Sequence, residues 1–305
     1  MIRAPHVRFL ADGRRLHLQD GPIDLVVQAF GADEEVQRAY QAAIEKFTGL
    51  LDALCDELPG LRAQADASGT RLRGRIARRM FAAVAPFADE CFITPMAAVA
   101  GAVAEEILGA MTAAADLDRA YVNNGGDIAL HLAPGQRFTV GLVDRPDKPS
   151  LIGTTVIEAE QRSRGIATSG RHGRSFSLGI ADAVTVLAAT AAQADAAATI
   201  IANAVDLPGH PAVTRVPACE LQPDNDLGDR LVTRNVAEMS RPDVDMALDA
   251  GAAMAERLVA HRLIDGAALR LQGESRSIGI GTAPSIVAPS IKQDAFKLNE
   301  SPMHA

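Results

Sequence analysis

The spacing of apolar residues along the chain predicts several amphipathic helices. From Asp33 onward, apolar side chains recur every three or four residues until Leu58-Pro59-Gly60, which predicts one long helix ending at that Pro-Gly pair. The segment AQADAAATIIANAV predicts a second helix, and a third is expected from about Asp243 to His261. These helices account for much of the apolar content of the chain.

The most apolar stretch is TPMAAVAGAVAEEILGAM, in which Thr94 is a good N-cap and Pro95 a good first helical residue. The helix predicted after them has one side made almost entirely of small residues. Glu105 and Glu106 interrupt its apolar run, which falls short of the ~18 uncharged residues that a membrane span needs. We therefore expect a soluble protein with no membrane partner. The side of small residues would let another backbone or a flat ligand approach closely, and close packing of the helix on a sheet is the plainer interpretation.

Between and after these helices the hydrophobic period changes to two, which predicts β-strands. RAYVN and DIALHL flank the turn Asn124-Gly125-Gly126, followed by RFTVGLV, TTVIEA, GIATS and AVTVLAAT, and later by AALRLQG. The order of elements predicts an α+β protein. We expect a single domain over residues 1–292, made of two strand-and-helix halves that meet near residues 112–118, and a loose tail over residues 293–305.

Charge and composition narrow the class of function. The chain has 305 residues, 48% of them hydrophobic, and a formal net charge of −8, which disfavours sequence-independent binding to nucleic acid. The beginning, MIRAPHVRFLADGRRLHL, has no apolar run of signal-peptide length. These observations indicate a cytoplasmic protein that does not bind nucleic acid.

One candidate for chemistry is the pair Asp195 and Thr199, four residues apart in ADAAAT. On a helix the two side chains project from the same face, one carboxylate beside one hydroxyl. Mg²⁺ prefers oxygen ligands and takes one or two from protein. The same pair is also common on exposed helix faces, so the spacing alone leaves both interpretations open.

A second candidate is the loop ATSGRHGRSFSLG, residues 167–179, which contains no acid. Its glycines can turn backbone N–H groups toward an anion, and Arg171 and Arg174 can add donors and charge, as a diphosphate requires. A plain polar turn is the alternative.

The turn NNGGD, residues 123–127, is a third candidate. It is first of all a hairpin signal, although Gly125 and Gly126 would let a ligand approach with Asp127 nearby as an acceptor.

In this order, VNNGGDIAL, RFTVGLVDRPDKP, GIATSG and AVTVLAATAAQADAAAT resemble the ApbE family of FAD:protein FMN transferases, once called thiamine biosynthesis lipoproteins. The resemblance is close over about residues 120–205. It is closer still to a cytoplasmic branch of that superfamily with no settled reaction, whose members share TPMAAVAGAVAE. It implies an ApbE-like, T-fold-related α+β fold of layered halves with a cleft between them.

The resemblance also implies roles for particular residues. Asp195 and Thr199 would bind Mg²⁺ beside the FAD diphosphate, with the backbone of Ala167 as a further ligand. The neighbours of Ala167 and the glycine turn would lie by the cofactor, together with the two arginines. These cofactor-binding candidates are Asn124, Gly125, Gly126, Asp127, Thr168, Ser169, Gly170, Arg171 and Arg174. In the parent reaction a protein Thr or Ser hydroxyl attacks the FMN phosphorus and AMP departs.

This chain departs from the family at one place. A His-containing segment that ends in Asp-Pro-x-Thr-Gly is replaced by the shorter RHGRSFSLGIAD, in which His172 and Asp182 are the candidate substitutes for catalysis. Three hypotheses follow: an Mg²⁺-dependent FAD-binding protein that transfers FMN to an acceptor flavoprotein, a non-catalytic module or assembly subunit of a redox enzyme, or an enzyme for another small anionic metabolite. Assembly as a homo-oligomer stays open.

Overall fold

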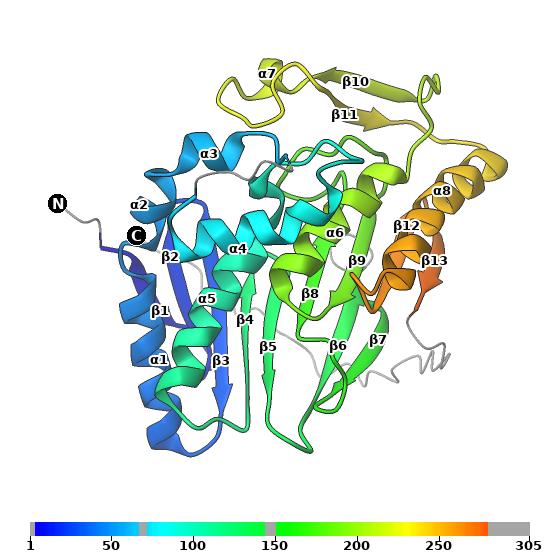
Figure 1. The fold of residues 1–305 in the computed structure, drawn as a ribbon. Coiled ribbons are helices and arrows are strands. Elements are labelled where there is room, and N and C mark those ends of the chain that lie inside the picture. The colour runs from blue at the N-terminus through cyan, green and yellow to red at the C-terminus, as the bar shows by residue number, and fades with distance from the viewer. Residues whose placement is uncertain (1–3, 67–71, 144–150, 280–305) are drawn as a thin grey trace, which may run out of the picture.

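A computed structural model describes residues 4–66, 72–143 and 151–279, and its centre is one antiparallel nine-stranded sheet (Figure 1). The strands of this sheet, in spatial order, are β1 (His6–Phe9), β2 (Leu16–Asp20), β3 (Ile23–Phe30), β4 (Arg119–Asn124), β5 (Asp127–Leu132), β8 (Gly165–Ser169), β9 (Ala183–Ala188), β12 (Gly266–Leu271) and β13 (Glu274–Ile278). Two further hairpins are formed by β6 (Arg137–Val143) with β7 (Leu151–Glu158), and by β10 (Val213–Pro217) with β11 (Leu231–Val236).

Helices cover one face of the sheet (Figure 1). They are α1 (Asp33–Phe47), α2 (Leu50–Cys55), α3 (Leu58–Arg62), α4 (Arg75–Val84), α5 (Val99–Ala114), α6 (Ala191–Ala204) and α8 (Arg241–Ala260), with short 3₁₀ turns η1 (Ala85–Phe87) and η2 (Pro95–Ala98). The short helix α7 (Ala218–Leu221) lies apart from them (Figure 1). The alternation of the strands explains this arrangement, because every second residue of β3 is buried while the residues between are partly exposed. The α+β class predicted from the order of elements is confirmed.

The sheet contains the same succession twice: a hairpin, two long helices and a second hairpin. The first copy is β2 and β3, α1 and α5, β4 and β5; the second is β8 and β9, α6 and α8, β12 and β13. The copies meet where β5 pairs with β8, through Ile128 and Ile166. Residues 112–118, where the junction was expected, comprise the end of α5 and its connection to β4, inside the first copy. The change of hydrophobic period there marks a change of element rather than a boundary between halves.

One prediction about helix ends is wrong, and another, the N-cap position of Thr94 before Pro95, is confirmed without the capping bond. The helix that begins at Asp33 ends at Phe47, and α2 and α3 follow as separate short helices. Gly49 breaks the run because its φ of 77° lies in the left-handed region. The side chain of Thr94 makes no capping bond; its hydroxyl donates to Asp226 instead, at 2.5 Å.

The apolar helix α5 lies between α1 and α6 on the sheet (Figure 1). Together with η2 it is long and apolar enough to cross a membrane by length and composition, but half of that window is buried inside the fold. Val103, Ile107 and Met111 are fully enclosed. It therefore packs as a core helix of this fold.

The opposite face of the sheet carries a smaller apolar cluster. It is built by Leu130, Leu132, Ile157, Ile166 and Leu187. Ile157 belongs to β7, so this cluster joins the β6–β7 hairpin to the sheet. The β10–β11 hairpin, with α7, lies instead beyond one end of the sheet (Figure 1).

Candidate functional site

The NNGGD turn places Asp127 at the end of the sheet next to β8. Gly125 and Gly126 both have positive φ, 66° and 118°, which a two-residue hairpin turn requires and side chains resist. The N–H of Gly126 donates to Asn123 Oδ1 at 2.8 Å. The Thr168 N–H, on β8, donates to Asp127 Oδ1 at 3.2 Å. The turn and the ATSG segment therefore meet at Asp127.

Asp195 reaches the same place from α6. Its Oδ2 accepts the N–H of Gly101 at 3.0 Å, and the N–H of Ala100 also bonds to this carboxylate. Both amides lie in the first turn of α5, where N–H groups have no partner within the helix. A Cβ at Gly101 would lie 2.3 Å from the carbonyl oxygen of Ala191. Only glycine permits α5 to approach α6 this closely.

Both carboxylates have a raised proton affinity, and the charge of Asp127 contributes to that of Asp195. Burial raises the pKa of Asp127 to about 7, although the Thr168 N–H and the charge of Arg174 act in the opposite direction. Burial also holds the pKa of Asp195 well above its usual range, with the charge of Asp127 as the second cause. Both side chains nevertheless keep some exposed surface. Near neutral pH the pair therefore favours a protonated carboxyl group or a bound cation.

Arg174 brings the loop of residues 167–179 to this acid pair. Its guanidinium packs against the turn, with Nη1 3.1 Å from the position of a Cβ on Gly125. The side chain is exposed, and its charge is felt by Asp127. A cation at the mouth of a site that holds two carboxylates can contact an anionic ligand that a metal ion bridges.

Thr199 lies one turn beyond Asp195 on the half-exposed side of α6. One turn further, Asn203 Oδ1 accepts the N–H of Leu178 at 3.0 Å, so this side of α6 runs along the loop. The predicted metal pairing of Asp195 with Thr199 stays a prediction.

Ala167 is fully buried in β8, opposite Val186 of β9. Its carbonyl belongs to the peptide unit whose N–H, that of Thr168, points to Asp127. In a trans peptide these two groups point in opposite directions, so the Ala167 carbonyl faces the β9 side. A cation between the two aspartates would have to be held without that oxygen, and Ala167 as a ligand stays a prediction.

Arg171, His172 and Asp182 form a separate cluster. Asp182 Oδ1 lies 2.6 Å from Arg171 Nη2 and 3.3 Å from His172 Nε2. Its Oδ2 accepts the main-chain N–H of Gln272 at 2.6 Å, in the turn between β12 and β13. The side chain predicted to contact phosphate, Arg171, is therefore engaged by a carboxylate. Gly170, with φ 145°, fits here because a Cβ would lie 2.6 Å from the Asp182 carbonyl oxygen.

The second half of the loop supports the fold. The Ser177 carbonyl accepts the N–H of Thr233 on β11 at 2.8 Å, and the Leu178 carbonyl accepts from Arg215 on β10 at 2.9 Å. Gly179 lies against α6, where a Cβ would stand 2.2 Å from the Ala202 carbonyl oxygen. The residues at the point where the chain departs from the family are thus packed between α6 and the β10–β11 hairpin.

Several contributors to the site were not expected from the sequence. Thr185 is buried and its hydroxyl lies 2.9 Å from that of Thr168. The amides of Ala100 and Gly101 could have been suspected, because a glycine in the first turn of a helix of small residues allows close approach. Gln272 carried no signal, since its role depends on a turn that comes far along the chain from the loop it supports.

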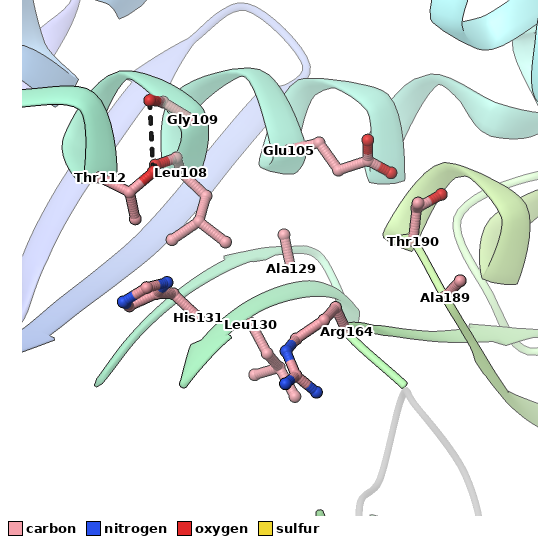
Figure 2. Close-up of a pocket in the computed structure, with 10 residues that line it drawn as sticks. All are labelled: Glu105, Leu108, Gly109, Thr112, Ala129, Leu130, His131, Arg164, Ala189 and Thr190. Atoms are coloured by element: carbon pink, nitrogen blue, oxygen red, sulfur yellow. Dashed lines mark hydrogen bonds between the residues drawn. The ribbon is translucent and has the colours of Figure 1, made fainter. Parts of the chain in front are cut away.

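A pocket of about 210 Å³ opens between α5, the sheet and the start of α6, and neither aspartate lines it (Figure 2). It is lined by Glu105, Leu108, Gly109, Thr112, Ala129, Leu130, His131, Arg164, Ala189 and Thr190. Figure 2 shows Glu105 directed from α5 toward the start of α6. There its Oε1 accepts the Ala192 N–H at 2.7 Å and its Oε2 lies 3.0 Å from Arg79 Nε. The carboxylate is thus committed to the fold.

Comparisons with known proteins identify a family and relatives of this chain. A family model described as "AbpE bacteria" matches residues 7–277. The UPF0280 protein of Methanopyrus kandleri is 41% identical over 128 residues, 42% of this chain and 48% of that protein. The UPF0280 protein of Methanothermobacter thermautotrophicus is 41% identical over 119 residues, 38% of this chain and 44% of that protein. Each match spans about half the length of the relative.

Two solved structures align with most of the chain. One is the apo form of the flavinyl transferase ApbE of Pseudomonas stutzeri, with a TM-score of 0.40, 13% identity, and coverage of 90% of this chain and 95% of that one. The other is the flavin transferase ApbE of Vibrio cholerae, with a TM-score of 0.38, 12% identity, and coverage of 87% and 96%.

Proposed function

Because this chain belongs to the family described as AbpE bacteria, we propose that it is a divalent-cation-dependent protein that binds a flavin nucleotide. The observation that carries the proposal is the pair Asp127 and Asp195, two desolvated carboxylates that keep some exposed surface and interact beside the exposed Arg174. Such a pair loses its repulsion when a divalent cation lies between the two groups.

The donor set fits Mg²⁺. Among the described residues, no three His, Cys, Asp or Glu side chains come together as a metal cage. Thr199 lies on the same side of α6 as Asp195 and could add a hydroxyl to the two carboxylates. The remaining coordination positions are then left to waters and phosphate oxygens, as Mg²⁺ prefers. When bound, the cation would neutralise charge on a diphosphate.

Different residues of the chain would contact different parts of the ligand. Arg174 would contact a phosphate, and the backbone of Gly125 and Gly126 would lie by the ring or ribose of FAD. In transfer, an acceptor hydroxyl oxygen forms a bond to the FMN phosphorus, the bond to AMP breaks, and the hydroxyl proton passes to a base. The acceptor is a Ser or Thr of a flavoprotein, and the cytoplasm is the proposed location.

A second candidate is a flavin-binding module without transfer activity. It is favoured by the packing of Ser177 and Leu178 between α6 and β11, and by the engagement of His172 with Asp182 away from the acid pair. In this case the loop that replaces the catalytic segment of the family would support structure only.

Incubation with FAD, Mg²⁺ and candidate acceptor proteins separates the two functions. Release of AMP with covalent FMN on the acceptor identifies the transferase, and tight FAD binding without AMP identifies the module. Failure of FAD to raise the melting temperature in the presence of Mg²⁺ would refute both and favour another small anionic metabolite.

A further inference from the structure

Gln272 adopts a backbone conformation that few side chains accept. It occupies the turn between β12 and β13 with φ 45°, and among the described residues only one other non-glycine, Arg262, has a positive φ. Such a conformation is costly for a residue other than Gly, Asn or Asp and persists only where surrounding contacts hold it. The two-residue turn Gln272-Gly273 between β12 and β13 itself requires positive φ at both positions. The contacts of Gln272 show what a residue other than glycine contributes at this position.

The main chain of Gln272 holds the first half of the loop of residues 167–179. Its N–H donates to Asp182 Oδ2 at 2.6 Å, and the other oxygen of that carboxylate binds Arg171, with Nε at 2.9 Å. The Arg171 N–H also donates to the Ala181 carbonyl at 2.9 Å. Through Asp182, the turn fixes the point from which the loop departs toward Arg174.

The side chain of Gln272 binds the segment after β11, and β11 contacts the second half of the loop of residues 167–179. Its Nε2 donates to the Ala237 carbonyl at 2.7 Å, and its Oε1 accepts the Met239 N–H at 3.0 Å. These residues follow β11, whose Thr233 N–H binds Ser177 of the loop. One residue thus holds both supports of the loop, one through its main chain and the other through its side chain.

We propose that Gln272 is a positioning residue, which holds the loop so that the Arg174 guanidinium stays against the Gly125 turn at the nucleotide site. The role of Asp182 follows: it transmits this restraint rather than reacting. The proposal rests on the proposed function for its effect on ligand binding, but the restraint on the loop is independent of any ligand.

The first test needs no nucleotide. Trypsin cleavage after Arg171 and Arg174, followed by mass spectrometry, reports how often the loop opens. Gln272→Gly keeps the positive φ and the N–H donor but loses both side-chain bonds, so we expect about fivefold to tenfold faster cleavage at these two arginines. Asp182→Asn should accelerate cleavage as well. Arg262→Gly, which relieves the same backbone strain away from the loop, should leave it unchanged.

The second test separates positioning from general loss of stability. At temperatures where the variants are fully folded, Gln272→Gly should weaken FAD binding in Mg²⁺ about tenfold while the affinity of the acid pair for Mn²⁺ alone stays as in the wild type. Equal cleavage rates in Gln272→Gly and wild type would overturn the restraint. Faster cleavage with unchanged FAD affinity would overturn its role at the site. Absence of FAD binding in the wild type would refute the proposed function alone.

Discussion

Glu105 on α5 and Asp195 on α6 each bind the first turn of the other's helix. Glu105 accepts the N–H of Ala192 at 2.7 Å, and Asp195 accepts that of Gly101 at 3.0 Å. A carboxylate at a helix N-terminus is stabilised by the helix dipole, which would lower its pKa. For Asp195, burial and the charge of Asp127 outweigh this effect, and its pKa is raised. The Asp195 carboxylate therefore has its hydrogen-bond partners, but a negative charge on it is still unfavourable beside Asp127.

The close approach of α5 and α6 predicts a large cost for a methyl group at Gly101. In Gly101→Ala the new Cβ would lie 2.3 Å from a backbone carbonyl, so one helix must shift and the free energy of unfolding should fall by about 2–3 kcal/mol. Gly109→Ala on the same helix meets nothing within 4 Å and should stabilise by about 0.5–1 kcal/mol. Urea denaturation measures both, and equal effects would argue against the packing described.

The acid pair predicts that the ligand-free protein loses stability as the pH rises. Its carboxyls have raised pKa values, Asp127 from 3.8 to about 7, so the folded protein holds protons that the unfolded chain releases. The melting temperature should therefore decrease between about pH 5 and pH 8. The lowered pKa values of Asp243 and Asp245 act only at more acidic pH. Saturating Mg²⁺ should flatten the decrease, and a flat profile without Mg²⁺ would contradict the prediction.

Removal of one like charge predicts a gain in stability and a loss of cation binding. Asp195→Asn keeps an oxygen that can accept the Gly101 N–H but no longer repels Asp127, so the ligand-free variant should be more stable at pH 8 by roughly 1–2 kcal/mol. The increase in melting temperature caused by Mg²⁺ should disappear. Differential scanning fluorimetry with and without EDTA measures both effects, and an unchanged response to Mg²⁺ would place the cation elsewhere.

Removal of Arg174 should make nucleotide binding weaker and less dependent on salt. The side chain is exposed, so Arg174→Ala should leave the melting temperature of the ligand-free protein nearly unchanged. Its affinity for FAD in Mg²⁺ should fall roughly 10-fold to 100-fold, because a charged donor to phosphate is lost. Arg78→Ala, an exposed arginine on α4, is the matched control. Isothermal titration at two salt concentrations decides, and equal losses in both variants would exclude a specific contact.

Much of the fold was predictable because hydrophobic period reports local structure directly. The strands around NNGGD and the helix AQADAAATIIANAV lie where the pattern placed them. The break at Gly49 was missed because apolar spacing continues across it while the backbone turns left-handed. The junction between the halves was missed because strand pairing between β5 and β8 is long-range and leaves no local signal.

The candidate site was predictable as a set of residues but not as a geometry. The sequence placed Asp127, Asp195 and Arg174 in separate motifs, and pairing of strands and helices brings them together. Arg171 and Arg174 looked equivalent, yet one faces Asp182 and the other the turn. Arg171 is held by Asp182, which in turn binds the main chain of Gln272, about a hundred residues away. The spacing of residues within the loop could not have predicted this difference.

The most direct test of the account is the binding of Mn²⁺ and FAD to the wild type, Asp127→Asn and Asp195→Asn at pH 8. Electron paramagnetic resonance counts bound Mn²⁺, and flavin fluorescence in the same samples reports FAD. The account predicts one Mn²⁺ per chain in the wild type, FAD binding that EDTA abolishes, and loss of both in each variant. Wild-type FAD binding that persists in EDTA, or variants that bind Mn²⁺ and FAD as the wild type does, would contradict it.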